Sequence, residues 1–221
     1  SLLAAVADHS PFLWRLAASD HARLRDMLES DPTHAIASAL DRLAAECRSA
    51  TDQAEVMTRL RRARQFTALY IALADLGGVW GLEQVTAALT AAADAFVSVA
   101  LDFLIREAVA DGKFSPVDSA DPQVECGLVV LALGKHGAGE LNYSSDVDLV
   151  VFYDPETAAA RLHGAEPGPF YVRLTKALAR LLSERTCDGY VLRVDLRLRP
   201  DPGSTAVAVS LPAALSYYET L

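Results

Sequence analysis

The sequence has little cysteine, a deficit of basic charge and no long uninterrupted apolar run. Its 221 residues include only three cysteines, Cys47, Cys126 and Cys187, which lack the spacing of metal ligands. They predict reduced thiols in a cytoplasmic protein. Lysine and arginine number 20 against 29 acidic residues, a formal net charge of −9. Because nonspecific nucleic-acid binding needs a basic footprint, we expect no nucleic-acid partner.

Other absences exclude further classes of protein and of active site. No apolar run reaches the roughly 18 residues of a membrane span, and residues 1–7 are too short and uncharged for a secretory signal, so we expect no membrane partner. No Walker A loop and no Ser-His-Asp or Cys-His set is evident. Apolar residues make up 52% of the chain, which is enough for a packed core. The first residue is not methionine, and a helical pattern at 217–219 runs to the end, so we expect a fragment of a longer protein.

Residues 1–112 carry the patterns of helices. Ser10-Pro11 and Asp31-Pro32 have the N-cap and first-position proline of helix starts, and a break is expected near Ser19. Asp52 begins a helix that should end at Gly77-Gly78. Apolar residues at helical spacing predict a last long helix from about 82 to 110.

Residues 113–221 alternate between strand and helix patterns. The proline-bearing loop 113–124 marks the boundary with the helical region. Strands are expected at 127–133, 147–153, 189–198 and 207–209, helices at 169–185 and from Pro212, and a loop at 154–168. These elements predict an α+β fold, in which a helical region (1–112) precedes a core with a small mixed sheet (113–221).

Two aspartates precede and enter the second of these strands. Asp146 and Asp148, at positions i and i+2, should point to one face, where their mutual repulsion costs free energy unless a cation offsets it. In the strand expected at 189–198, Asp195 shares a face with Arg193, Arg197 and Arg199. If the two faces meet, three carboxylates could hold Mg²⁺ or Mn²⁺ while arginines bind phosphate oxygens, an arrangement typical of phosphoryl or nucleotidyl transfer. The alternative is a solvated face with salt bridges between strands.

A glycine-rich turn lies just before the aspartate pair. Gly134, Lys135 and Gly139 could bind phosphate through backbone N–H groups and a point charge, although such turns are common. Ser144 and Ser145 could bind phosphate as well, or could cap the turn. His136 is more readily interpreted as an exposed turn residue than as a general base.

The arginines at 59, 61, 62 and 64 lie together on one expected helix. A solvated helix face is the simpler interpretation of this cluster. A docking patch for an acidic partner is the alternative.

The strings LGKHGAGELNYSSDVDLVVFYD (133–154) and RVDLRLRPDPGS (193–204) resemble the signature segments of glutamine synthetase adenylyltransferase. That family belongs to the DNA polymerase beta-like nucleotidyltransferase superfamily. The two strings occur in the family's order, and the helical residues 1–112 resemble the region ahead of its first catalytic domain. Two departures, His136 and Ala138, fall inside the first string. The family domain also continues past Leu221.

The resemblance implies a function and a site. Asp146, Asp148 and Asp195 would bind Mg²⁺ or Mn²⁺, and Gly134, Gly139 and Ser145 would lie near phosphate, with Arg197 and Arg199 as weaker candidates for nucleotide contact. The ELNYSSD string resembles the family's N-terminal copy, which removes AMP from a tyrosine of glutamine synthetase by phosphorolysis and releases ADP. Partners would be adenylylated glutamine synthetase, phosphate and ADP, and a PII-type signal protein. The alternatives are the ATP-dependent adenylylating copy and a nucleotide- or PII-binding module without turnover.

Overall fold

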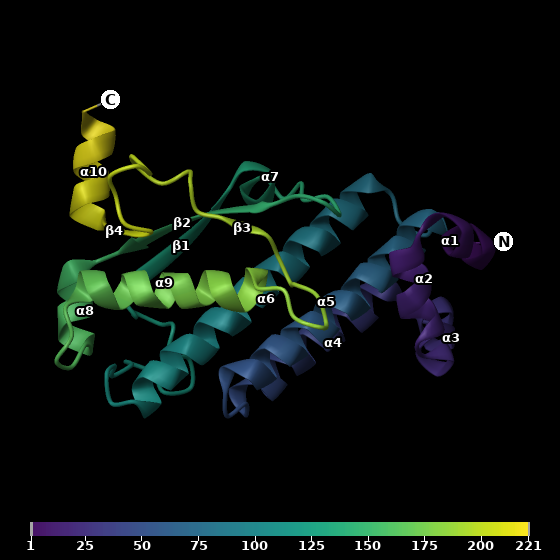
Figure 1. Cartoon of the computed structure of the whole chain (residues 1–221), viewed down its shortest axis with the longest axis horizontal. Coiled ribbons are helices and arrows are strands. Elements are labelled where there is room, and N and C mark those ends of the chain that lie inside the picture. Colours follow the sequence, from purple (N-terminus) through teal and green to yellow (C-terminus); the bar gives the residue numbers. More distant parts are fainter. Residues whose placement is uncertain (1, 221) are drawn as a thin grey trace.

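Long helices and a small sheet make up the chain in the computed structural model, which describes residues 2–220 (Figure 1). The helical region contains α1 (Leu2–His9), α2 (Pro11–Ala18), α3 (His21–Glu29), α4 (Pro32–Arg48), α5 (Gln53–Leu76) and α6 (Leu82–Ala110). The second region contains β1 (Leu128–Leu133), α7 (Gly134–Gly137), β2 (Val147–Tyr153), α8 (Pro155–Arg161), α9 (Pro167–Ser183), β3 (Val194–Asp195), β4 (Ala208–Ser210) and α10 (Leu211–Glu219). The predicted α+β class and small mixed sheet are confirmed.

Local capping signals set the starts of several helices. Ser10 and Asp31 cap α2 and α4 through side-chain oxygens that accept backbone N–H groups, each followed by proline at the first helical position. Asp52 caps α5, which ends at Gly77 as predicted. The predicted break near Ser19 separates α2 from α3. The helix expected at 82–110 has those bounds.

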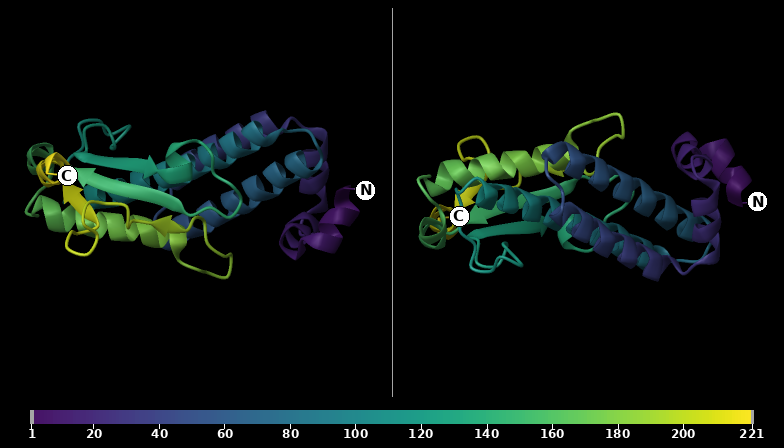
Figure 2. Two further views of the ribbon diagram at one scale, coloured as in Figure 1. Left: turned by 90° about the horizontal axis from the view of Figure 1, so that it is seen from above. Right: turned by 90° about the horizontal axis from the view of Figure 1, so that it is seen from below.

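The sheet is mixed, with β2 at its centre. β1 pairs antiparallel with β2, while β3 and β4 pair parallel with the two ends of β2 along its other edge. Helices α6 and α9 cover one face of the sheet, where Leu149 and Val151 are buried, and α10 lies over the other face beside Val150 and Phe152. The two views of Figure 2 show the sheet at one end of the long helices and α1–α3 at the other.

One hydrophobic cluster crosses the predicted boundary between the two regions. It joins Leu43, Val56 and Phe96 of the helical region to Leu149 and Leu178 of the second region. α6 lies within this core. By length and composition alone α6 could also cross a membrane, although 56% of its most apolar window is buried inside the fold.

Two sequence-based expectations are wrong. Residues 154–168 are not a loop throughout, because Asp154 caps α8 and Pro155 occupies its first position. The strand expected at 189–198 shortens to Val194–Asp195. The N–H groups of Val191 and Leu192 donate to the carbonyl of Leu182 at the end of α9, so they are not available to the sheet.

Candidate active site

The three predicted carboxylates lie on neighbouring positions of the sheet. Val147 and Leu149 are buried toward the helices, so Asp148 between them points to the opposite face, and Asp146 precedes it by two residues. In the parallel ladder Asp148 is the register partner of Asp195. Because paired residues of adjacent strands share a face, Asp195 lies on the same side as Asp148.

Arginines engage two of these carboxylates. Arg193 donates from Nε to Oδ1 of Asp146 at 2.5 Å and from Nη2 to the carbonyl oxygen of Ser144. Arg197 donates from Nε to both carboxylate oxygens of Asp195, at 3.0 and 2.9 Å, and its Nη2 lies 2.5 Å from Oδ2. The hydrogen bonds from the Arg197 side chain and backbone lower the pKa of Asp195, so this carboxylate is ionised at neutral pH.

The chemistry of the donor set suits Mg²⁺ or Mn²⁺, both of which prefer hard oxygen ligands. The side chains are not gathered around one point, however. Within residues 2–220, no group of three or more acidic, histidine or cysteine side chains is arranged to hold a metal ion. Asp146 and Asp195 turn toward Arg193 and Arg197 instead, so metal binding requires these carboxylates to share or leave their arginine partners.

The glycine-rich turn packs directly on Asp148. Gly134 has a φ of +56°, and a Cβ atom there would lie 2.6 Å from Oδ2 of Asp148. A Cβ at Gly137 would lie 2.4 Å from the carbonyl oxygen of Ala132. Lys135 is exposed, and Gly139 has a φ of +74° with open space around it. Glycine at 134 therefore permits a close approach of the turn to the carboxylate.

Hydrogen bonds order the loop that leads into β2. The Ser145 hydroxyl accepts the N–H of Asn142 at 3.2 Å, and the Asn142 side chain accepts the N–H of Ser144 at 3.0 Å. Ser145 thus caps this turn, and the Ser144 carbonyl binds Arg193. Tyr143 donates its hydroxyl to Oδ2 of Asp75 at 2.8 Å, which ties the loop to the end of α5.

The remaining arginine candidate has a different environment. Arg199 donates to the carbonyl oxygens of Leu196, Pro202 and Thr205 at 2.7 to 3.3 Å. Its guanidinium holds the turn that follows β3. Of Arg197 and Arg199, Arg197 is the exposed residue and the one that contacts a candidate carboxylate.

The structure corrects two expectations about polar residues near the site. His136 is buried rather than exposed, and its Nε2 lies 2.7 Å from Oδ1 of Asp94 on α6. Arg61 does not belong to a solvated helix face, because it is buried and donates to four carbonyl oxygens, those of Met57, Leu181, Glu184 and Gly189. No sequence pattern predicted these contacts, since Asp94 lies 42 residues from His136 and three of the four carbonyls lie 120 or more residues from Arg61.

Comparison with known proteins shows the family of the chain. The family model for glutamate-ammonia ligase adenylyltransferase matches residues 1–221. Similar curated proteins are named bifunctional glutamine synthetase adenylyltransferase/adenylyl-removing enzyme. One from Bradyrhizobium sp. (strain ORS 278) is 53% identical over 99% of this chain and 22% of its own length. One from Xanthobacter autotrophicus is 55% identical over 97% of this chain and 21% of its own. The chain thus spans about a fifth of the length of these relatives, and it belongs to the glutamate-ammonia ligase adenylyltransferase family.

Proposed function

We propose that this chain carries the adenylyl-removing activity of the family. In this reaction phosphate attacks the phosphorus of an AMP group on a glutamine synthetase tyrosine. The bond from phosphorus to the tyrosine oxygen breaks, and the products are ADP and a tyrosine that recovers its proton. The register pairing of Asp148 with Asp195, with Asp146 two residues before Asp148, supports nucleotidyl-transfer chemistry. The resemblance of the ELNYSSD string to the family's N-terminal copy supports removal of AMP rather than its addition.

Each part of the site has a role under this proposal. Asp146, Asp148 and Asp195 would hold Mg²⁺ or Mn²⁺, which when bound lowers the charge barrier to attack and stabilises the leaving phenolate. The exposed guanidinium of Arg197 lies beside Asp195 and can bind an oxygen of the incoming phosphate. The Gly134 turn, whose glycine lets the backbone lie close to Asp148, would bind the adenylyl phosphate through its N–H groups. Catalysis then consists mainly of positioning and electrostatic stabilisation.

The printed name of the relatives covers both adenylylation and its reversal, so adenylylation is the second candidate. The deciding experiment incubates this chain with adenylylated glutamine synthetase, Mg²⁺ or Mn²⁺, and phosphate, and measures ADP. Phosphate-dependent ADP release is the expected result. If unmodified glutamine synthetase instead gains AMP from ATP, the adenylylating reaction is the correct assignment.

Substitutions at the carboxylates test the site itself. We expect Asp146→Asn and Asp148→Asn each to lower turnover at least about 100-fold and to weaken Mn²⁺ binding measured by calorimetry. Asp41→Asn on the exposed face of α4 is the matched control and should change neither quantity. Full activity in either site variant would contradict the role of these carboxylates.

A further inference from the structure

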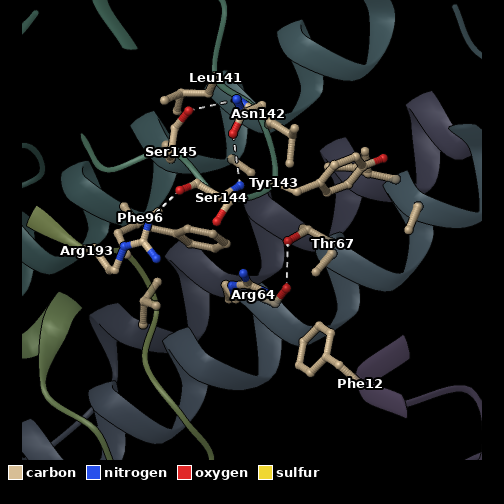
Figure 3. Close-up of a pocket in the computed structure, with 18 of the residues that line it drawn as sticks. Phe12, Arg64, Thr67, Phe96, Leu141, Asn142, Tyr143, Ser144, Ser145 and Arg193 are labelled. Carbon is tan, nitrogen blue, oxygen red and sulfur yellow. Dashed lines mark hydrogen bonds between the residues drawn. The ribbon is translucent and has the colours of Figure 1, made fainter. Parts of the chain in front are cut away.

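A second feature of the molecule is a cavity of about 430 Å³ between the helical region and the loops that lead into the strands. Its walls come from α2, α5 and α6 and from residues 141–145 and 190–193. Figure 3 shows Phe12 and Arg64 on one side, with Ser144, Ser145 and Arg193 on the other. The volume and the mainly apolar walls are those of a small-molecule site.

This cavity lies on the other side of β2 from the carboxylates. Val147 contributes to its wall, whereas Asp148, the next residue, points to the opposite face of the sheet. Ser144 and Ser145 form part of the wall just before Asp146. The cavity therefore lies on the other face of β2 from Asp148, although Ser144, Ser145 and Arg193 border both the cavity and the candidate active site.

Arg64 places a positive charge in these apolar walls. Its guanidinium carbon lies 5.6 Å from the centre of the Phe12 ring, and burial lowers its pKa. Within residues 2–220, its side chain has no hydrogen bond or ion pair, since the Arg64 contact drawn in Figure 3 is made by its carbonyl oxygen. A partly buried cation without a counterion favours an anionic ligand.

The other charged groups of the cavity do not argue against an anionic ligand at Arg64. Arg193 is already neutralised by Asp146. Asp75 accepts the hydroxyl of Tyr143 and lies 11 residues from Arg64 on the same helix, roughly 16 Å along its axis. Arg15 also lies over the Phe12 ring, at 5.9 Å, and adds positive charge at the Arg64 end.

We propose that this cavity binds a small organic anion with a flat apolar body, whose anionic group contacts Arg64. The body would lie against Phe12, Phe96 and the aliphatic residues of α5 and α6. Because Ser144 and Ser145 form the opposite wall, an occupant contacts the loop whose backbone Arg193 holds beside Asp146. Occupancy is thus coupled to the position of a candidate catalytic carboxylate. The proposal does not depend on which reaction the active site performs.

Two dyes of similar shape test the proposal directly. The probes are 8-anilinonaphthalene-1-sulfonate, an apolar body with one anionic group, and neutral N-phenyl-1-naphthylamine. Each is titrated into the chain and followed by fluorescence. We expect saturable binding of the sulfonate at one site and about tenfold weaker binding in Arg64→Gln, because a charge-assisted contact is lost. The neutral probe should bind Arg64→Gln as it binds the unaltered chain.

Arg62→Gln is the matched control, because it removes the same charge from an exposed position of the same helix. It should leave both affinities unchanged. Ala68→Phe, which places a large side chain in the cavity wall, should abolish binding of both probes while circular dichroism shows an intact fold. The proposal is overturned if the sulfonate does not bind saturably, or if it binds Arg64→Gln and Arg62→Gln equally well.

Discussion

Arg193 binds both the side chain of Asp146 and the backbone of Ser144, two residues earlier in the chain. It therefore fixes the end of the loop and the carboxylate that follows it in one contact. Both partners of the ion pair are about half exposed, at 48% and 51%. Exposed pairs of this kind contribute at most about 1 kcal/mol to stability. The contact is better suited to positioning Asp146 than to stabilising the fold.

We expect Arg193→Gln to lower turnover about tenfold or more while the melting temperature changes by only a few degrees. Mn²⁺ affinity should rise by about two- to fivefold, because the guanidinium no longer competes with the cation for Asp146. Calorimetry and ADP release measure the two effects. Arg42→Gln on the exposed face of α4 should change neither. A parallel loss of Mn²⁺ binding, turnover and melting temperature would instead indicate a structural role.

Gly134→Ala tests the packing of the turn on Asp148. The positive φ costs roughly 1–2 kcal/mol for a residue with a side chain, and the added methyl group must also displace the carboxylate, which lies 2.6 Å away. Gly112→Ala provides the control, because Gly112 has a similar φ of +69° and open space around it. We expect both variants to lose similar stability in urea unfolding, but only Gly134→Ala to lose Mn²⁺ binding and turnover. Normal Mn²⁺ binding by Gly134→Ala would contradict the close contact.

Arg61 joins the helical region to the segment between α9 and β3. It is 1% exposed, and its guanidinium donates hydrogen bonds to four carbonyl oxygens. We expect Arg61→Ala to lower the free energy of unfolding by about 3–5 kcal/mol, because the buried carbonyls lose a charged donor and the side chain leaves a cavity. Arg61→Lys should recover only part of this, since an ammonium cannot reproduce the planar fork.

The neighbouring exposed residue supplies the comparison for Arg61. Arg62→Ala should change the free energy of unfolding by no more than about 0.5 kcal/mol. Equal effects of Arg61→Ala and Arg62→Ala in urea unfolding would show that the buried hydrogen bonds of Arg61 do not join the two regions.

The sequence predicted those elements whose signals are local. The caps Ser10, Asp31 and Asp52 and the alternation of β2 lie within a few residues of what they specify. The 189–198 segment alternates in the same way. However, the N–H groups of Val191 and Leu192 bind the carbonyl of Leu182 in α9, and the carbonyl of Gly189 binds the Arg61 side chain of α5, rather than β2. The alternation of apolar and polar residues indicates which face a residue prefers. It does not indicate which distant partner binds its backbone groups.

The same distinction applies to the candidate site. The i, i+2 spacing predicted that Asp146 and Asp148 point to one face, and the short parallel ladder pairs Asp148 in register with Asp195. The buried state of His136 and Arg61 was not predictable, because it depends on Asp94 and on carbonyls more than 100 residues from Arg61. Charge on a helix or turn suggests exposure until a tertiary partner is known.

The three thiols should differ sharply in reactivity. Burial raises the pKa of Cys47 from 9.0 to about 11 and also raises that of Cys126, whereas Cys187 is exposed. Because the thiolate is the reactive form, we expect a disulfide reagent at pH 8 to label one thiol quickly in the native chain and three after unfolding. Cys187→Ser should abolish the fast reaction. Two fast thiols in the native chain would contradict the burial of Cys47 or Cys126.

The burial of the Cys47 thiol should make the free energy of unfolding depend on pH in the alkaline range. A raised pKa in the folded state contributes stability that is fully present below about 9 and is lost as the pH rises toward 11, because the unfolded chain releases a proton that the native chain retains. We therefore expect the free energy of unfolding in urea to fall between pH 9 and 11. Cys47→Ala should reduce this slope, although it lowers stability at every pH by removing a buried side chain. An unchanged slope in Cys47→Ala would show that Cys47 does not set it.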